Sequence, residues 1–297
     1  MRKSFARAIV RECNFPDCFF LTGDLGFMAL EEVRASFGTR FINCGVAEQN
    51  MVSVAAGLAR EGLRCFVYSI APFVYARPYE QIRNDVCFGD LSLCLVGNGG
   101  GYAYGHMGPT HHALEDCAAL SALGVRCMVP AFDEDIGPMI QSVGGPCYLR
   151  LGYDVRPEGS AVPAWRPWRM ILFGGAGCCV ALGPLAGLAW SVLAELPEER
   201  RPALWACTEL PIAPLPGELY ASVRDSRLVV IEEHHVQGGL GMALSYALLK
   251  EQCLPRRMIH RYALGYPSKR YGSQTFHRTE CGLDARSLHD LFAGNAE

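Results

Sequence analysis

The 297-residue sequence has no excess of positive charge, because 27 Lys and Arg stand against 30 Asp and Glu. Proteins that hold nucleic acid by its phosphates need clustered basic residues, so the composition argues against that class. A hydrophobic run long enough to span a membrane is also missing: residues 170–194 carry no charge, but glycines and Pro184 interrupt them. Arg11 comes before any apolar region of an export signal develops. We therefore expect a soluble, cytoplasmic protein.

Common metal and phosphate motifs are absent as well: there is no C-x-x-C, no H-E-x-x-H and no G-x-x-x-x-G-K-[ST]. The 14 cysteines lie mostly in apolar runs such as 178–182, where a reduced thiol packs as a small hydrophobic group. We expect reduced cysteines and predict no metal ligands.

Half of the residues are hydrophobic, and short apolar runs alternate with helical stretches. This alternation predicts an α/β protein with two doubly wound, mostly parallel-sheet domains. Residues 156–168 contain three prolines and no periodicity, which is typical of a linker, so we expect domains at 1–155 and 169–297. The expected strands lie at 19–21, 40–44, 64–69, 91–96, 126–129, 147–150, 178–182, 203–207 and 228–232.

Unusual residues follow four of these strands, in the segments GDLG, GVAEQN, IAPF and GNGGGYAYGHMGPTHH. Ligands of parallel α/β sheets gather where the strands end, so these segments predict a binding site at one sheet edge. Glu48 is expected to open a helix there, where the exposed N–H groups favour an acid. Ala47, Val54 and 55–57 predict a small, buried helix face around it. Such burial would raise the pKa of the carboxyl group, which suits proton exchange with a neutral ring nitrogen.

Thr110 is expected to be a helix N-cap, which would place His111 and His112 in the first helical turn. They are then either polar residues of a helix start or, for His111, a group that binds or protonates a substrate oxygen. Arg150 closes a strand, and is either an anion anchor or part of an ion pair.

Several segments together resemble one known family. Residues 40–86, GHMGPTHHALED at 105–116 and CYLRLG at 147–152 resemble the pyrimidine-binding domain of the transketolase family of thiamine-diphosphate enzymes. VVIEEHHVQGGLGMAL at 229–244 resembles the C-terminal domain of that family. This resemblance implies that Glu232, Glu233, His234 and His235 form a turn between a strand and a helix and not a metal site. The nearest resemblance is to the C-terminal subunit of split transketolases, in which one enzyme is divided between two polypeptides.

The resemblance implies roles for individual residues. Glu48 corresponds to the glutamate that activates the cofactor's aminopyrimidine, and Phe73 to the aromatic residue that stacks on it, although the spacing leaves Tyr75 possible. Asp24 and Leu25 correspond to a loop beside the cofactor.

On the substrate side, His111 corresponds to the histidine that contacts donor and acceptor oxygens. His106 lies beside the substrate position, and Arg150 corresponds to an arginine that grips a sugar phosphate. Met107 stands where many family members have an acidic residue for a sugar hydroxyl, and a thioether is a weak acceptor. The usual preference for a ketose phosphate is thereby put in question.

The sequence has no GDG motif, which in the family helps to hold Mg²⁺ and the diphosphate. A partner subunit is therefore expected to supply those ligands, in an α2β2 assembly. The implied reaction is transfer of a two-carbon ketol unit between aldoses. One alternative is a 2-oxoacid dehydrogenase beta-like or hybrid subunit that passes a two-carbon unit to a lipoyl or carrier-protein thiol. Another is a non-catalytic scaffold subunit.

Overall fold

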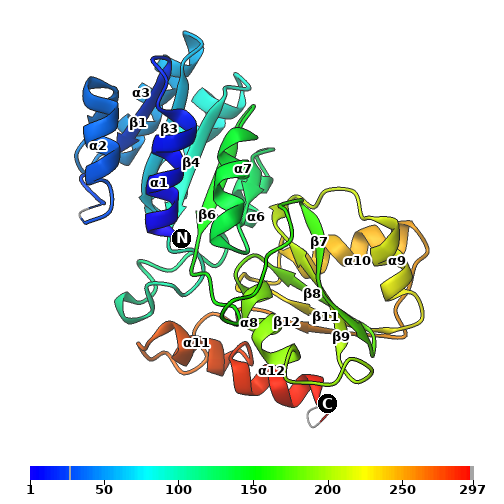
Figure 1. Ribbon diagram of the computed structural model, residues 1–297. Coiled ribbons are helices and arrows are strands. Elements are labelled where there is room, and N and C mark those ends of the chain that lie inside the picture. Colours follow the sequence, from blue (N-terminus) through cyan, green and yellow to red (C-terminus); the bar gives the residue numbers. More distant parts are fainter. Residues whose placement is uncertain (27, 295–297) are drawn as a thin grey trace.

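The structure is a computed structural model that describes residues 1–26 and 28–294, and it contains two β-sheets with helices on both faces (Figure 1). Most neighbouring strands in each sheet are parallel. The predicted α/β class with two doubly wound sheets is confirmed.

The first sheet has seven strands in the order β10-β5-β6-β4-β3-β1-β2. Its apolar strands are buried on both faces, as expected for a parallel sheet covered by helices. The strands are β1 (Cys18–Thr22), β2 (Phe41–Asn43), β3 (Arg64–Ile70), β4 (Leu93–Asn98), β5 (Arg126–Met128), β6 (Cys147–Leu151) and β10 (Glu209–Leu210).

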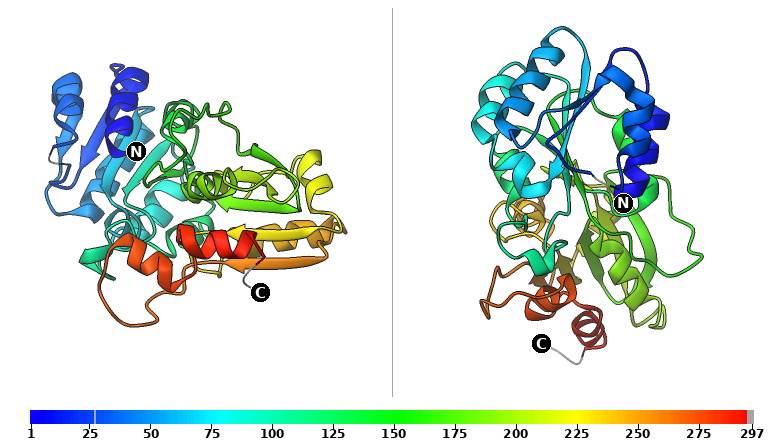
Figure 2. Two further views of the ribbon diagram at one scale, coloured as in Figure 1. Left: turned by 60° about the horizontal axis from the view of Figure 1, so that its bottom comes forward. Right: turned by 90° about the vertical axis from the view of Figure 1, so that its left-hand side faces the viewer.

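Helices cover this sheet from two sides, which the right-hand view of Figure 2 shows. One face is covered by α1 (Arg2–Cys13), α2 (Glu31–Phe37) and α7 (Ile136–Gln141), whose apolar residues share one core with the strands. The other face is covered by α3 (Glu48–Arg60), α4 (Ala71–Tyr75), α5 (Tyr79–Gln81), a π-helical segment at Ile82–Cys87, and α6 (Asp116–Ser121). Short 3₁₀ turns lie at Gly38–Arg40, Gly105–Met107 and Asp133–Asp135.

The second sheet has five strands in the order β12-β11-β8-β9-β7, and β7 alone of its described strands runs antiparallel. Two helices pack on each face. The elements are β7 (Trp168–Gly175), β8 (Cys178–Leu182), α8 (Leu185–Leu193), β9 (Pro202–Cys207), α9 (Gly217–Val223), β11 (Arg227–Ile231), α10 (Leu240–Lys250), β12 (Arg257–Arg261), α11 (Gln274–Glu280) and α12 (Ala285–Phe292).

The two sheets are joined by more than the connecting chain. Residues 152–167 form neither helix nor strand, but β10 leaves the second sheet and pairs antiparallel with β5 of the first. One apolar core cluster also contains residues from both sheets, such as Val67 and Val180. The two halves therefore share packing as well as backbone hydrogen bonds.

The cysteines and the apolar helices bear on two expectations from the sequence, reduced thiols and the lack of a membrane-spanning segment. All 14 cysteines lie among the described residues and are free thiols, and 12 of them are buried. Within residues 1–26 and 28–294, no helix combines the length and the apolar character that crossing a membrane requires.

Candidate active site

The chemistry-bearing residues predicted from the sequence follow the carboxyl ends of adjacent parallel strands. Asp24 follows β1, Glu48 follows β2, Phe73 follows β3 and His111 follows β4, and these four strands are neighbours in the sheet. Arg77 contacts both Glu48 and Phe73, and His111 contacts Phe73. The predicted location of the site is the one usual for parallel α/β sheets.

Glu48 is the first residue of α3, because the preceding Ala47 has a non-helical backbone (φ −143°). Its side chain is nearly buried, and its Oε1 accepts a hydrogen bond from Arg77 Nη1 at 2.6 Å. The predicted helix face around it is only partly buried, because Val54 and Gly57 are exposed whereas Ala55 is covered. The carboxylate therefore has a cationic partner rather than a wholly apolar environment.

Phe73 lies on α4 and presents its ring to Arg77, whose guanidinium carbon is 3.7 Å from the ring centroid. At this distance the planar cation lies against the aromatic face in a cation–π contact. Tyr75, two residues on, points elsewhere: it is buried, and its hydroxyl donates to Glu115 at 2.7 Å. Of the two aromatic candidates, Phe73 is the one that contacts Arg77, the partner of Glu48.

His111 completes this group, with its ring centroid 5.1 Å from that of Phe73 and the ring planes at 64°. The predicted helix start at Thr110 is wrong. Residues 109–111 form a turn, and Ala113 then pairs with Gly101 in an antiparallel bridge. Because the bridge holds this backbone extended, α6 begins only at Asp116.

His106 and Met107 lie in a 3₁₀ turn of the same loop, and both are exposed. The loop lies close to the C-terminal half of the chain at Gly108 (φ +74°), where an added Cβ would lie 2.0 Å from the Tyr271 ring. A side chain there would meet both backbone strain and a clash. The loop that carries His106 and His111 therefore packs against the C-terminal half of the chain.

His112 faces away from the site. Its Nδ1 lies 3.0 Å from the Tyr266 hydroxyl, and the two rings stack at 5.6 Å. Burial and the neighbouring His277 lower the pKa of His112. Consecutive histidines thus have different surroundings: His111 borders the site, and His112 anchors the loop in the second unit.

Asp24 and Leu25 border a groove next to the loop that leads to Glu48. Asp24 has a left-handed backbone (φ 56°), and its Oδ1 accepts from the amide of Asn43 at 3.0 Å. Asn43 Oδ1 in turn accepts from the backbone N–H groups of Asp24 and Gly45. These bonds fix the loop after β1 to the loop after β2.

Arg150, for which the resemblance implies a role toward a sugar phosphate, has several partners within the chain. It is 5% exposed and donates through Nε to Asp116 at 2.8 Å. Its Nη2 donates to the carbonyl oxygens of Ala113 and Glu233, which belong to the two different halves. A role toward a sugar phosphate stays a prediction; the contacts present join the halves.

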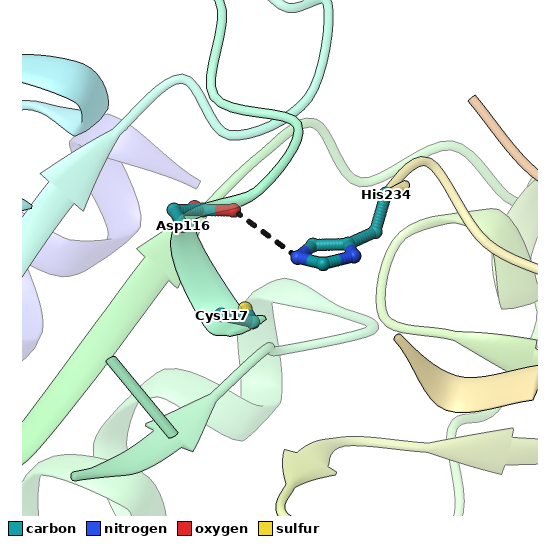
Figure 3. A group of neighbouring side chains, drawn as sticks. All are labelled: Asp116, Cys117 and His234. Carbon is teal, nitrogen blue, oxygen red and sulfur yellow. Dashed lines mark ion pairs between the residues drawn. The ribbon is translucent and has the colours of Figure 1, made fainter. Parts of the chain in front are cut away.

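Asp116, Cys117 and His234 bring three potential ligand atoms together at this junction (Figure 3). However, Asp116 is already paired with Arg150, and burial raises the pKa of the Cys117 thiol well above its usual range. His234 Nδ1 lies 2.8 Å from the carbonyl oxygen of His235 and Nε2 accepts from the N–H of Ala118, so the ring is neutral. A divalent cation would meet a guanidinium and a protonated thiol, so these contacts favour a junction between the halves over a metal centre.

Sequence reasoning missed two residues of the site, Arg77 and Tyr104. Tyr104 lies 6.1 Å from the His111 ring and accepts from the side chain of Asn98. The local signal for Arg77 was a spacing of four residues from Phe73, which puts two side chains on one face where the backbone is helical. This signal is weak here, because α4 ends at Tyr75 and Arg77 lies in the turn after it.

Comparison with known proteins places this geometry in a family. Residues 1–151 match the family described as transketolase, pyrimidine binding domain. The chain is 33% identical to 1-deoxy-D-xylulose-5-phosphate synthase 2 of Geobacter sulfurreducens over 84% of its length, but spans only 41% of that protein. It is 29% identical to one subunit of the apulose-4-phosphate transketolase of Actinobacillus succinogenes, over 86% of this chain and 84% of that polypeptide.

Solved structures give the same result. A split-gene transketolase, described as an inactive beta4 tetramer, matches with a TM-score of 0.80 and 27% identity, over 99% of this chain and 97% of that one. The transketolase of Campylobacter jejuni, at 15% identity, shares the fold with a TM-score of 0.75 over 99% of this chain and 46% of its own. The chain belongs to the transketolase family.

Proposed function

We propose that this chain is the pyrimidine-binding subunit of a heteromeric, thiamine-diphosphate-dependent enzyme that transfers a two-carbon ketol unit. The observation that carries the proposal is the nearly buried carboxylate of Glu48 at the head of α3, which shares the partner Arg77 with the half-buried ring of Phe73. A planar nitrogen-containing ring can stack on the aromatic side chain while one of its ring nitrogens bonds to the carboxylate.

The site's own contacts support the fit of such a ring. The guanidinium of Arg77 is itself a planar group of nitrogens, and it lies 3.7 Å from the Phe73 centroid while bonding to Glu48. There is thus room beside Phe73 for a flat π-system with an N–H directed at the carboxylate. Thiamine diphosphate, when bound, supplies the carbon centre through which the two-carbon unit passes.

Each residue then has a distinct task. Glu48 exchanges a proton with the ring nitrogen of the aminopyrimidine, and Phe73 fixes the plane of that ring. Asp24 and Leu25 border the cofactor from the neighbouring loop. His111, at the rim of the Phe73 ring, donates to or accepts from oxygen atoms of the sugar substrates, with His106 beside them.

A partner polypeptide completes the site in this proposal. The chain spans 84% of a relative that is one subunit of a transketolase, but 41% of a relative that is a longer synthase. The sequence contains no GDG motif, so the partner would supply the diphosphate-binding domain and the Mg²⁺ ligands. The expected assembly is α2β2, with each active site at an interface between unlike subunits.

The test replaces Glu48 in the assembled enzyme. The chain and its co-purified partner are assayed for ketol transfer as wild type, Glu48→Gln and Glu48→Ala, with Glu61→Gln at the other end of α3 as the matched control. Loss of a positioned proton-transfer group lowers rates by about 10²–10⁴-fold, so both Glu48 variants should lose transfer while assembly is retained. Near-wild-type turnover in Glu48→Ala would overturn the proposal.

The exposed side chain of Met107 on the loop of His111 favours consideration of a second reaction, because it offers no strong acceptor for a sugar hydroxyl. In that reaction the two-carbon unit passes to a lipoyl or carrier-protein thiol. A donor labelled with ¹³C separates the two: label recovered on a sugar supports ketol transfer, and label recovered on a thiol supports the alternative.

A further inference from the structure

Arg77 has two contacts that coincide with the two tasks assigned to the cofactor-binding face. Its Nη1 donates to Glu48 Oε1 at 2.6 Å, and its guanidinium carbon is 3.7 Å from the centroid of the Phe73 ring. The proposed function assigns hydrogen bonding of the aminopyrimidine to Glu48 and stacking to Phe73. One arginine side chain therefore occupies both recognition groups.

The chemistry of the two occupants is similar enough for one to replace the other. A guanidinium is planar and delocalised, stacks on aromatic faces and directs N–H groups at a carboxylate. An aminopyrimidine has the same combination of a flat π-face and nitrogen atoms along its edge. His111 also contacts the Phe73 ring, with the centroids 5.1 Å apart and the ring planes at 64°, whereas the guanidinium of Arg77 lies over the ring.

Arg77 is also placed to leave this position without disturbing the fold. It lies between α4 and α5, and its side chain is 45% exposed. Glu48 is nearly buried, but the guanidinium itself reaches solvent, and ion pairs and cation–π contacts of exposed cations contribute little to stability. The guanidinium can exchange its two protein contacts for water at modest cost.

We infer that Arg77 is a placeholder that fills the pyrimidine-binding face in the absence of cofactor and is displaced when the cofactor binds. The inference rests on the proposed function. Cofactor binding is then a competition with Arg77. The measured affinity equals the intrinsic affinity of the site multiplied by the fraction of molecules in which Arg77 has left the face.

The experiment measures the Kd of thiamine diphosphate, in the presence of Mg²⁺, for the complex of the full chain with its partner. Arg77→Met removes the charge and the planar group, and Arg83→Met removes an exposed arginine of the adjacent π-helical segment as the matched control. The summed exposed contacts correspond to about tenfold, so Arg77→Met should bind the cofactor about tenfold more tightly. Arg83→Met should bind it like wild type.

Arg77→Lys keeps the charge but not the planar face, and should fall between wild type and Arg77→Met. Equal or weaker binding by Arg77→Met, with its thermal unfolding unchanged, would overturn the placeholder role while leaving the proposed function in place. A wild-type complex that assembles but binds no thiamine diphosphate would instead overturn the proposed function, and the inference with it.

Discussion

Arg77 and Arg150 each bond to a carboxylate of their own, Glu48 at 2.6 Å and Asp116 at 2.8 Å, yet their surroundings differ in every other respect. The Arg77 side chain is 45% exposed and packs on a single aromatic ring, whereas Arg150 is 5% exposed and bonds to both halves of the chain. The distance of an ion pair is therefore a poor guide to its role. Burial makes the Arg150 pair part of the junction, and exposure makes the Arg77 pair exchangeable.

The largest expected difference comes from removing the two carboxylates in turn. Asp116→Ala leaves the buried Arg150 without its partner and frees the Tyr148 hydroxyl, which donates to the same Asp116 oxygen at 2.7 Å. The expected loss in free energy of unfolding is about 3–5 kcal/mol. Glu48→Ala leaves Arg77 in contact with solvent, and the expected loss is below about 1 kcal/mol. Urea unfolding measures both, and equal losses would remove the distinction between the two pairs.

A smaller effect concerns pH and the neutral histidines of the junction. Burial lowers the pKa of His234, although the nearby Asp116 opposes this shift, and burial also lowers the pKa of His112. Each histidine therefore takes up a proton more readily in the unfolded chain, and stability should fall as the pH is lowered through the unfolded value of about 6.5. The slope for each is at most about 1.4 kcal/mol per pH unit.

Urea unfolding at a series of pH values between about 8 and 5.5, a range that spans the reference pKa of histidine, measures how the free energy of unfolding changes with pH. His234→Gln should have a shallower slope than wild type. His289→Gln, which changes a half-exposed histidine on α12, is the matched control and should keep the wild-type slope. A His234→Gln slope equal to that of wild type would mean that this ring does not contribute.

The smallest effect concerns the contact between His112 and Tyr266, which joins the loop of His111 to the C-terminal half of the chain. Tyr266→Phe removes only the hydroxyl that contacts His112 Nδ1, so the free energy of unfolding should fall by about 1 kcal/mol. Because His112 is next to His111, amide hydrogen exchange at residues 105–112 should become faster. Tyr246→Phe, on the exposed face of α10, is the control and should change neither quantity. Unchanged exchange in Tyr266→Phe would mean that the contact between His112 and Tyr266 does not order residues 105–112.

Sequence alone predicted the parts of this structure that depend on local pattern. Glu48 at the head of α3 and the strand β8 at 178–182 follow from apolar periodicity and glycine or proline punctuation, and the structure confirms both. The helix start at Thr110 failed because a long-range bridge to Gly101 overrides the local capping preference. Tertiary pairing of this kind leaves no trace in a short sequence window.

The partners of the two arginines were beyond sequence for the same reason. Arg150 meets Glu233, which is 83 residues away, and an ordinary strand-ending arginine gives no sign of that contact. The pairing of Arg77 with Glu48 connects residues 29 apart, one at the head of α3 and the other between α4 and α5. A family resemblance identifies which residues matter, but the burial that separates a joint from an exchangeable contact appears only in three dimensions.

The strand β10 has a consequence for how this protein can change over evolutionary time. Glu209 and Leu210 come from the second half of the chain, yet they form the outer strand of the first sheet, beside Met128 and Cys127. A recombination event with its crossover in residues 152–167 would join a first half to a foreign strand, and would separate Arg150 from Glu233 as well. The two halves are therefore expected to be inherited together, as one unit of recombination, although their sheets look like separable modules.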